Sequence, residues 1–348
     1  MAHRAMCGDR VFEHINSIVA RYDIDKIRFA DDILPRPYFK TLLPKLAEAG
    51  HKIELSCEIK SNISFAEFSL LRQAGFSEVQ PGIESFSTDV LKNINKGVSA
   101  IRNIATLKFG KENGVQVHYN ILYGFPSDEM KFYEEMIKTI PCLYHLDPPY
   151  SYGNVLLCRF APMQTMPGRF GIANVDFASD EYNVVFSRKF MESNQFEMKN
   201  YCYYFSRTYE IPAELQELFA VVDIQVEHWQ SAHRGTPPEL FYEIVTGGIR
   251  FHDSRHTSAP VCVERGADVA DVYRAISNEI MTIEKLIQSL KGQVGAHDVI
   301  EIVNDLVSLR VAYREGNQLL GLALKKSHVV PPEREPSNLQ QYDAKEMI

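Results

Sequence analysis

The chain has 348 residues, of which 45% are apolar, and a net charge of −8 from 37 basic and 45 acidic side chains. This length predicts a sizeable buried core and roughly two domains of about 150 residues each. The acidic balance argues against binding nucleic acid, because neutralising phosphates needs clustered Lys and Arg. No apolar run of about 18 residues and no apolar leader occur, so we expect no membrane span and no signal peptide.

The cysteines are widely scattered, and no two of them have CxxC spacing. Scattered cysteines in a long chain without an export signal are typical of reduced thiols. We therefore expect a cytoplasmic protein. The six positions are Cys7, Cys57, Cys142, Cys158, Cys202 and Cys262.

Helical and strand patterns alternate through the first half of the chain. Apolar spacing predicts helices over residues 9–22, 38–49, 65–74, 88–113 and 128–139. Short apolar or alternating segments predict strands over residues 26–34, 52–60, 77–84, 115–123 and 154–160. Strands that alternate with helices favour a parallel sheet, so we expect an α/β fold built as a parallel (β/α) barrel.

Charged or turn-forming residues follow each predicted strand. They are Asp31 and Asp32, Glu58 and Lys60, Glu84 and Ser85, Gly124 to Pro126, and Arg159. In a parallel barrel the carboxyl ends of the strands meet at one face, where functional groups gather. A site at this face is the interpretation we favour. The alternative is that these acids cap the helices that follow them.

The second half is less regular. The stretch from about 161 to 248 is rich in aromatic residues. A short strand over 249–251, helices over 269–276, 281–290 and 297–309, and a hairpin over 311–324 then predict an α+β, winged-helix-like domain. The expected parts are a barrel (1–165), a connecting region (166–247), the C-terminal domain (248–326) and a disordered polar tail (327–348).

A winged helix invites comparison with DNA-binding domains. The helix expected over 297–309 instead carries Asp298, Glu301 and Asp305, a surface that repels phosphate. An acidic winged helix is better suited to a peptide, which it can bind by adding a strand to its sheet. We therefore expect a peptide partner and no nucleic acid.

Three segments carry a resemblance to a known family. They are QPGIESFS at 80–87, which is followed by Val90–Leu91 and Asn95–Lys96–Gly97, YNILYGFP at 119–126 and EIKSN at 58–62. They resemble the core strands of radical S-adenosylmethionine (radical SAM) enzymes. More narrowly, they resemble the branch that matures ribosomally made peptides and includes cobalamin-dependent C-methyltransferases. Segments at 147–149, 159–162, 169–172 and 252–255 fit the same branch, so the resemblance spans about residues 3–325.

The resemblance implies a fold, a cosubstrate and a set of binding residues. It implies a TIM-like partial barrel that binds S-adenosylmethionine, with the precursor peptide as substrate. Glu84 would contact the ribose or methionyl group, and Asp31 and Asp32 the ammonium. No catalytic residue is assigned. The residues expected to bind S-adenosylmethionine are Asp31, Asp32, Glu58, Lys60, Gln80, Glu84, Asn120, Gly124 and Arg159.

The family's cluster motif is missing. Members hold a [4Fe–4S] cluster with CxxxCxxC after the first barrel strand, and this spacing does not occur in the chain. The resemblance begins near His3, just after the place of that loop. We expect the first strand, the cluster loop and any cobalamin domain to lie upstream of Met1. The alternative is a short protein that has lost this chemistry.

Two other functions stay open. One is a non-catalytic peptide-binding partner derived from the barrel, and the other is an acid–base barrel enzyme that uses Asp31, Asp32 and Glu84. The HxxxH spacing of His252 and His256 lacks the Glu of HExxH, so we expect no metal site there.

Overall fold

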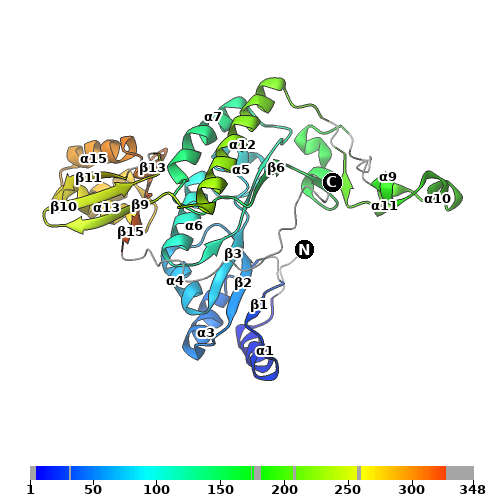
Figure 1. Ribbon diagram of the computed structural model, residues 1–348, viewed down its shortest axis with the longest axis horizontal. Coiled ribbons are helices and arrows are strands. Elements are labelled where there is room, and N and C mark those ends of the chain that lie inside the picture. The colour runs from blue at the N-terminus through cyan, green and yellow to red at the C-terminus, as the bar shows by residue number, and fades with distance from the viewer. Residues whose placement is uncertain are drawn as a thin grey trace. The chain divides into compact units, whose positions relative to one another are not determined.

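Figure 1 shows the chain as a computed structural model, which describes residues 5–30, 33–173, 175, 182–206, 209–256 and 260–326. Asp31, Asp32 and the tail predicted over 327–348 lie outside these ranges. The residues form two units. As far as they are described, Met1–Ile121, Phe132–Tyr152 and Val221–Val330 make up the first unit, and Leu122–Lys131 and Gly153–Ala220 the second. Within the described ranges, every helix is too short or too polar to cross a lipid bilayer.

A parallel sheet forms the centre of the first unit. Its strands are β1 (Lys26–Arg28), β2 (Glu54–Ile59), β3 (Phe76–Pro81) and β4 (Gln116–Val117), in that order. Each neighbouring pair is parallel. A parallel bridge between Glu84 and Ile121 extends the ladder to β5 (Asn120–Tyr123). The predicted α/β fold with a partial parallel (β/α) barrel is confirmed.

One helix precedes these strands and others connect them, and the helix ends follow from local sequence. They are α1 (Gly8–Arg21), α2 (Tyr38–Thr41), α3 (Leu43–Ala49), α4 (Phe65–Gln73), α5 (Thr88–Asn93) and α6 (Ala100–Glu112). Ser64 and Glu67 form a capping box that starts α4. The helix predicted over 88–113 is two helices, because Asn95 (φ 58°) and Gly97 (φ 71°) adopt left-handed backbone between them.

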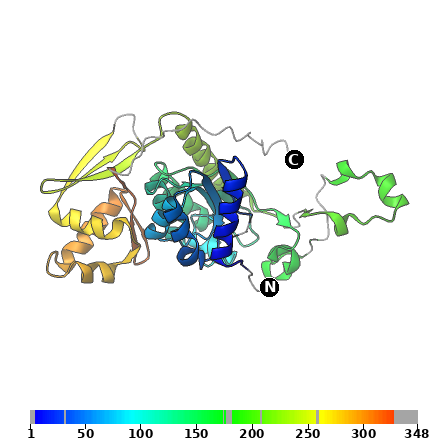
Figure 2. The same cartoon turned by 90° about the horizontal axis from the view of Figure 1, so that it is seen from below.

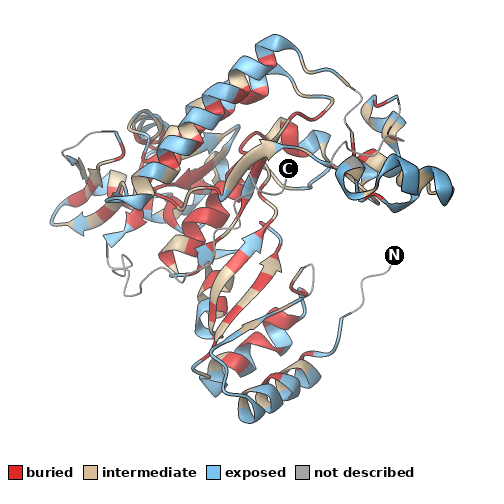
Figure 3. Ribbon diagram, turned by 45° about the vertical axis from the view of Figure 1, so that its right-hand side comes forward, coloured by how far each residue is buried: buried red, intermediate tan, exposed pale blue. Residues whose placement is uncertain are grey.

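The core lies between the sheet and its helices. Along β2 buried residues alternate with partly exposed ones, as the red and tan strands of Figure 3 show. Leu55, Cys57 and Ile59 are the buried members. Helix α6 passes so close to β4 that a Cβ at Gly110 would lie 2.3 Å from Val117 Cγ2. Glycine is therefore needed at this crossing.

The C-terminal part of the first unit is an α+β fold, with helices followed by a hairpin as predicted. One sheet has the order β11 (Val261–Gly266), β10 (Gly248–Asp253), β9 (Leu240–Val245) and β15 (Leu324–Lys325). A second has the order β12 (Met281–Thr282), β14 (Gln318–Gly321) and β13 (Ala312–Glu315). The helices are α13 (Ala267–Ser277), α14 (Ile283–Ser289) and α15 (Ala296–Ser308), which lie to one side of the yellow strands in Figure 2. The predicted domain boundaries stay predictions.

Four further elements, all lying at least partly in the first unit, complete it. They are α7 (Met130–Thr139), the 3-10 turn η1 (Ile140–Leu143), β6 (Ser151–Asn154), which pairs with β5, and α12 (Ala213–Arg234). The buried Trp229 of α12 donates a hydrogen bond from Nε1 to the Leu146 carbonyl, 2.9 Å away. This bond satisfies the indole inside the core.

The second unit contains much of the aromatic-rich stretch, up to Ala220. Its elements include β7 (Leu157–Cys158), α8 (Pro162–Thr165), η2 (Pro167–Phe170), α9 (Tyr182–Val185), α10 (Arg188–Ser193), α11 (Met198–Tyr201) and β8 (Tyr204–Phe205). The prediction of one parallel-sheet strand over 154–160 is wrong. β7 pairs antiparallel with β8, and Phe160, at φ 70°, ends the extended segment. Periodicity alone could not show that the partners of Leu157 and Cys158 are Phe205 and Tyr204, far along the sequence.

A buried ion pair joins α6 to the C-terminal fold. Lys108 Nζ lies 2.7 Å from Glu112 Oε2 and donates to the Ser277 carbonyl at 2.6 Å. Glu112 Oε1 accepts from the Lys325 amide at 2.9 Å. Burial lowers the pKa of Lys108, and the Glu112 carboxylate opposes that shift. The pair thus ties α6 to the end of α13 and to β15.

We predict that Lys108→Met lowers the free energy of unfolding by about 3–5 kcal/mol, because it leaves the Glu112 carboxylate buried and unpaired. Urea denaturation measures the change. Adding Glu112→Gln should recover part of the loss, since the amide no longer buries a charge. The control is Lys92→Met, which breaks an exposed pair with Asp89 and should cost less than about 1 kcal/mol. Equal losses for the two lysines would contradict the role of the buried pair.

Candidate functional site

A pocket of about 340 Å³ opens where β2 and β3 end and β5 begins. This is the edge of the sheet at which parallel-barrel proteins place their functional groups. All of its lining residues belong to the first unit. They are Ile33, Glu58, Ile59, Lys60, Ser61, Gln80, Pro81, Gly82, Glu84, Lys96, Val98, Tyr119 and Asn120.

The strand register brings the polar residues together. Glu58 on β2 pairs with Gln80 on β3, and Ile59 pairs with Pro81. Because paired residues of neighbouring strands project to the same side of a sheet, Glu58 and Gln80 enter the pocket side by side. Asn120 joins them from β5, where its Oδ1 accepts from Ser151 Oγ at 3.0 Å.

An ion pair lies inside the pocket. Lys96 Nζ is 2.7 Å from Glu84 Oε1, and the two side chains are 34% and 21% exposed. Glycine at position 82 leaves room for this pair, since a Cβ there would lie 2.7 Å from Lys96 Nζ and 3.1 Å from Glu84 Oε1. Both ends of the pair remain reachable from solvent, so a charged ligand can compete for either.

The backbone at Glu84 has left-handed geometry, with φ at 57°. For a residue with a side chain this costs about 1–2 kcal/mol. Asn103 of α6 is fully buried and donates from Nδ2 to the carbonyls on either side, Ile83 at 2.8 Å and Ser85 at 2.9 Å. These two bonds hold the turn and direct the Glu84 carboxylate into the pocket.

The structure brings together five of the nine residues that the sequence assigned to S-adenosylmethionine. They are Glu58, Lys60, Gln80, Glu84 and Asn120. Asp31 and Asp32 lie outside the described residues, although the next residue, Ile33, lines the pocket. Lys96 and Asn103 were missed, because neither follows a predicted strand. Lys96 was part of the first resemblance segment, as Asn95–Lys96–Gly97, but it was not assigned to the site, because residues 88–113 were predicted to form one helix.

Gly124 and Arg159 belong to the second unit. Gly124 adopts φ 81°, its amide donates to Asp128 Oδ2 at 2.9 Å, and its carbonyl accepts from Tyr209 Oη at 2.7 Å. Arg159 donates to the Cys202 carbonyl at 2.7 Å and the Lys199 carbonyl at 2.5 Å. These contacts give both residues a structural role, and their assignment to S-adenosylmethionine stays a prediction.

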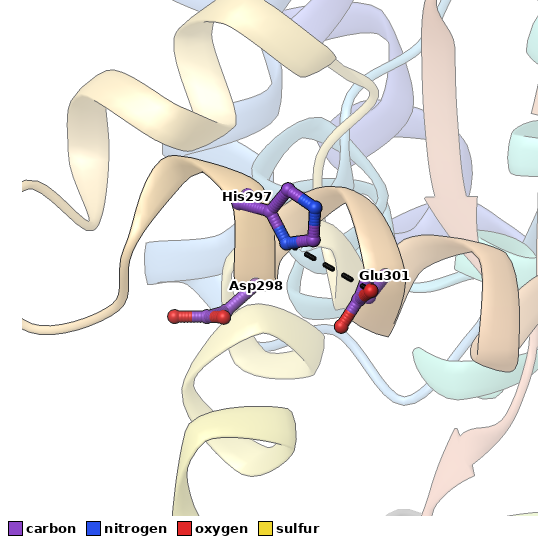
Figure 4. Close-up of side chains that lie close together, drawn as sticks. All are labelled: His297, Asp298 and Glu301. Carbon is purple, nitrogen blue, oxygen red and sulfur yellow. Dashed lines mark ion pairs between the residues drawn. The ribbon is translucent and has the colours of Figure 1, made fainter.

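Among the described residues, which include all six cysteines, no three thiols lie close enough together to hold a [4Fe–4S] cluster. Cys57 is buried in β2, where burial raises the pKa of its thiol to about 12. Within the described part of the chain, the one group of three side chains spaced to hold a metal is His297, Asp298 and Glu301 on α15. Figure 4 shows them on the helix surface, where all three are exposed and contain no thiol.

No family model matches the chain. Over 146 residues, or 41% of the chain, it is 28% identical to an uncharacterized methyltransferase of Pyrococcus horikoshii, 31% of which is covered. Among solved structures it is similar to TsrM, a radical S-adenosylmethionine methyltransferase from Kitasatospora setae with tryptophan substrate and a S-adenosylmethionine analogue bound. That match has 14% identity and a TM-score of 0.45, and covers 65% of this chain and 47% of TsrM.

A second solved structure is OxsB, a cobalamin-dependent S-adenosylmethionine radical enzyme with aqua-cobalamin and S-adenosylmethionine bound. That match has 15% identity and a TM-score of 0.36, and covers 40% of this chain and 22% of OxsB. Both of these structural neighbours are radical S-adenosylmethionine enzymes. The chain spans less than half the length of each of the three proteins.

We predict that Asn103→Leu lowers the free energy of unfolding by about 2 kcal/mol, since two buried carbonyls lose their donor. It should also release the Glu84 turn, which amide hydrogen exchange at Ser85 and Phe86 would detect as faster exchange. Asn113→Leu is the matched control, because Asn113 donates to a single carbonyl at the end of α6. Unchanged exchange at the turn in Asn103→Leu would show that Asn103 does not hold it.

Proposed function

We propose that the pocket at the ends of β2 and β3 binds S-adenosylmethionine, and that the chain acts within a radical SAM enzyme that modifies a ribosomally synthesised peptide. The observation that carries the proposal is that two carboxylates and two lysines line one pocket of about 340 Å³. The carboxylates are Glu58 and Glu84, and the lysines are Lys60 and Lys96. A volume of this size lies within the range of small-molecule sites.

The donor set matches the ligand group by group. S-adenosylmethionine carries an ammonium, a carboxylate, a ribose diol and an adenine. Carboxylates such as Glu58 and Glu84 can accept charge-assisted hydrogen bonds from the ammonium and the ribose hydroxyls. A lysine can meet the ligand carboxylate as a compact positive charge. Gln80 and Asn120 add neutral amides to the lining of the pocket.

The Lys96–Glu84 pair keeps the empty pocket electrically balanced. When the ligand ammonium takes the place of Lys96 on Glu84, the freed Lys96 can turn to the ligand carboxylate. Each charge is then still paired, so binding need not bury an uncompensated ion. The pair thus prepares the pocket for a zwitterionic ligand.

The reaction class and the partners belong to the same proposal. The description of the Pyrococcus relative as a methyltransferase supports methyl transfer as the reaction class. A peptide carbon as the acceptor is part of the proposal. Cobalamin and a [4Fe–4S] cluster would serve the whole enzyme in a cytoplasmic setting. Since the residues present do not fit the cluster, we assign this chain the binding of S-adenosylmethionine and the precursor peptide, and no radical step.

Calorimetric titration with S-adenosylmethionine tests the pocket. We predict binding to the wild-type chain and a loss of about 10- to 100-fold in affinity for Glu84→Gln, the value of a hydrogen bond to a charged group. The control is Asp89→Asn, an exposed carboxylate on α5, which should leave the affinity unchanged. No binding to the wild-type chain, together with affinity for the precursor peptide that survives Glu84→Ala, would instead support a non-catalytic partner.

A second prediction concerns the cluster. Anaerobic incubation of this chain with iron and sulfide should give no visible charge-transfer absorption and no reductive cleavage of S-adenosylmethionine, because its thiols do not gather. Metal analysis after desalting provides an independent readout. Stoichiometric uptake of four irons per chain would overturn this part of the account.

A further inference from the structure

The sheet of the C-terminal fold has a covered face and an open one. Tyr242 of β9 and Phe251 of β10 pack on Tyr273 of α13, with ring centroids 5.0 Å and 4.8 Å away. Side chains alternate along a strand, so the neighbours of these residues project to the opposite face. There the register places His252 of β10 beside Cys262 of β11.

Three side chains on the open face form a continuous hydrogen-bonded chain. Cys262 Sγ lies 3.1 Å from His252 Nδ1, and His252 Nε2 lies 3.1 Å from Glu243 Oε1. They come from three adjacent strands, β11, β10 and β9. A nucleophile in contact with a base that a third group orients is the arrangement of activated nucleophiles in enzymes.

Glu243 determines which nitrogen of the neutral His252 imidazole carries the proton. Hydrogen bonds from Lys326, His252 and Arg250 lower the pKa of Glu243 to about 2, so it stays a carboxylate and can only accept. In the neutral imidazole, Nε2 therefore carries the proton that it donates to Glu243. The lone pair of Nδ1 is left facing the Cys262 thiol, ready to accept its proton.

The ring is also held in place. His252 stacks on Phe241 with centroids 4.4 Å apart and planes 18° apart. Lys326 Nζ lies 2.8 Å from Glu243 Oε2, and Arg250 bridges Glu243 and Glu264. The base and its orienting carboxylate are thus fixed before any reagent arrives.

The thiol is accessible. Cys262 is exposed, and β11 is the outer strand of the sheet among the described residues. A purely structural explanation is that polar side chains commonly pair across neighbouring strands on an exposed sheet face. Such pairs, however, do not require a thiol. Cysteine is among the residues most often buried, so an exposed one against an oriented imidazole calls for a chemical explanation.

We propose that Cys262, His252 and Glu243 form a reactive-thiol site that exchanges with low-molecular-weight disulfides of the glutathione type. His252 Nδ1 takes the thiol proton as the sulfur of Cys262 attacks one sulfur of the disulfide. The disulfide S–S bond breaks, and a mixed disulfide forms on Cys262. The leaving thiolate takes the proton from His252, so one disulfide and one thiol give one mixed disulfide and one thiol.

The test is the rate at which each cysteine of the reduced full chain gains glutathione from glutathione disulfide at neutral pH, followed by site-resolved mass spectrometry. His252→Gln should slow modification of Cys262 by about 100-fold or more, the lower end of the usual contribution of a general base. The exposed Cys7 serves as the internal control, and its rate should not change. His297→Gln, a variant at an exposed histidine of α15, should leave Cys262 at the wild-type rate.

Glu243→Gln provides a second variant of nearly unchanged shape, and it should give a smaller loss at Cys262 alone. If His252→Gln does not fold, the rate at Cys262 in Glu243→Gln tests the proposal. A wild-type rate at Cys262 in either folded variant would overturn the proposal. So would a wild-type chain whose Cys262 gains no glutathione while Cys7 does.

Discussion

The parallel pairing of β2 with β3 is the constraint on which the candidate site depends. Its register places Glu58 beside Gln80 at the carboxyl ends of both strands. A shift of one residue would turn these side chains to the other side of the sheet and carry Leu55, Cys57 and Ile59 out of the core. The apolar residues that fix the register of β2 and β3 therefore also fix the positions of Glu58 and Gln80 at the strand ends. The packing of the core and the position of the site both follow from this register.

The sheet alone does not complete the pocket. Glu84 reaches it through a left-handed backbone that costs free energy, and Asn103 of α6 stabilises this turn through the carbonyls on either side. Lys96 then enters from the segment between α5 and α6 and pairs with Glu84. Helix α6 is itself tied to the C-terminal fold by the buried Lys108–Glu112 pair. Interactions far from the pocket thus hold one of its walls.

Sequence patterns predicted the parallel sheet and its polar strand ends, because both follow from strands that alternate with helices. Five of the residues that the family resemblance assigned to the site line one pocket. Sequence patterns could not predict the contribution of Lys96, since the break between α5 and α6 depends on left-handed backbone at Asn95, a conformation that apolar spacing does not encode. They also missed that Leu157 and Cys158 pair with Phe205 and Tyr204, far along the sequence. The sequence analysis considered His252 only together with His256, as a possible metal site. The contact of His252 with Cys262 was not foreseen, because it arises from the pairing of β10 with β11. Local sequence patterns predict helices and strands, whereas the pairing of strands distant in sequence determines which side chains come into contact.

The central claim is that the strand ends form the S-adenosylmethionine site. A crystal structure of this chain grown with S-adenosylmethionine tests it most directly. The account predicts the ligand between the ends of β2, β3 and β5, with its ammonium on Glu84 and with Lys96 moved off that carboxylate. A ligand bound elsewhere, or Lys96 still paired with Glu84 at saturating ligand, would contradict this claim.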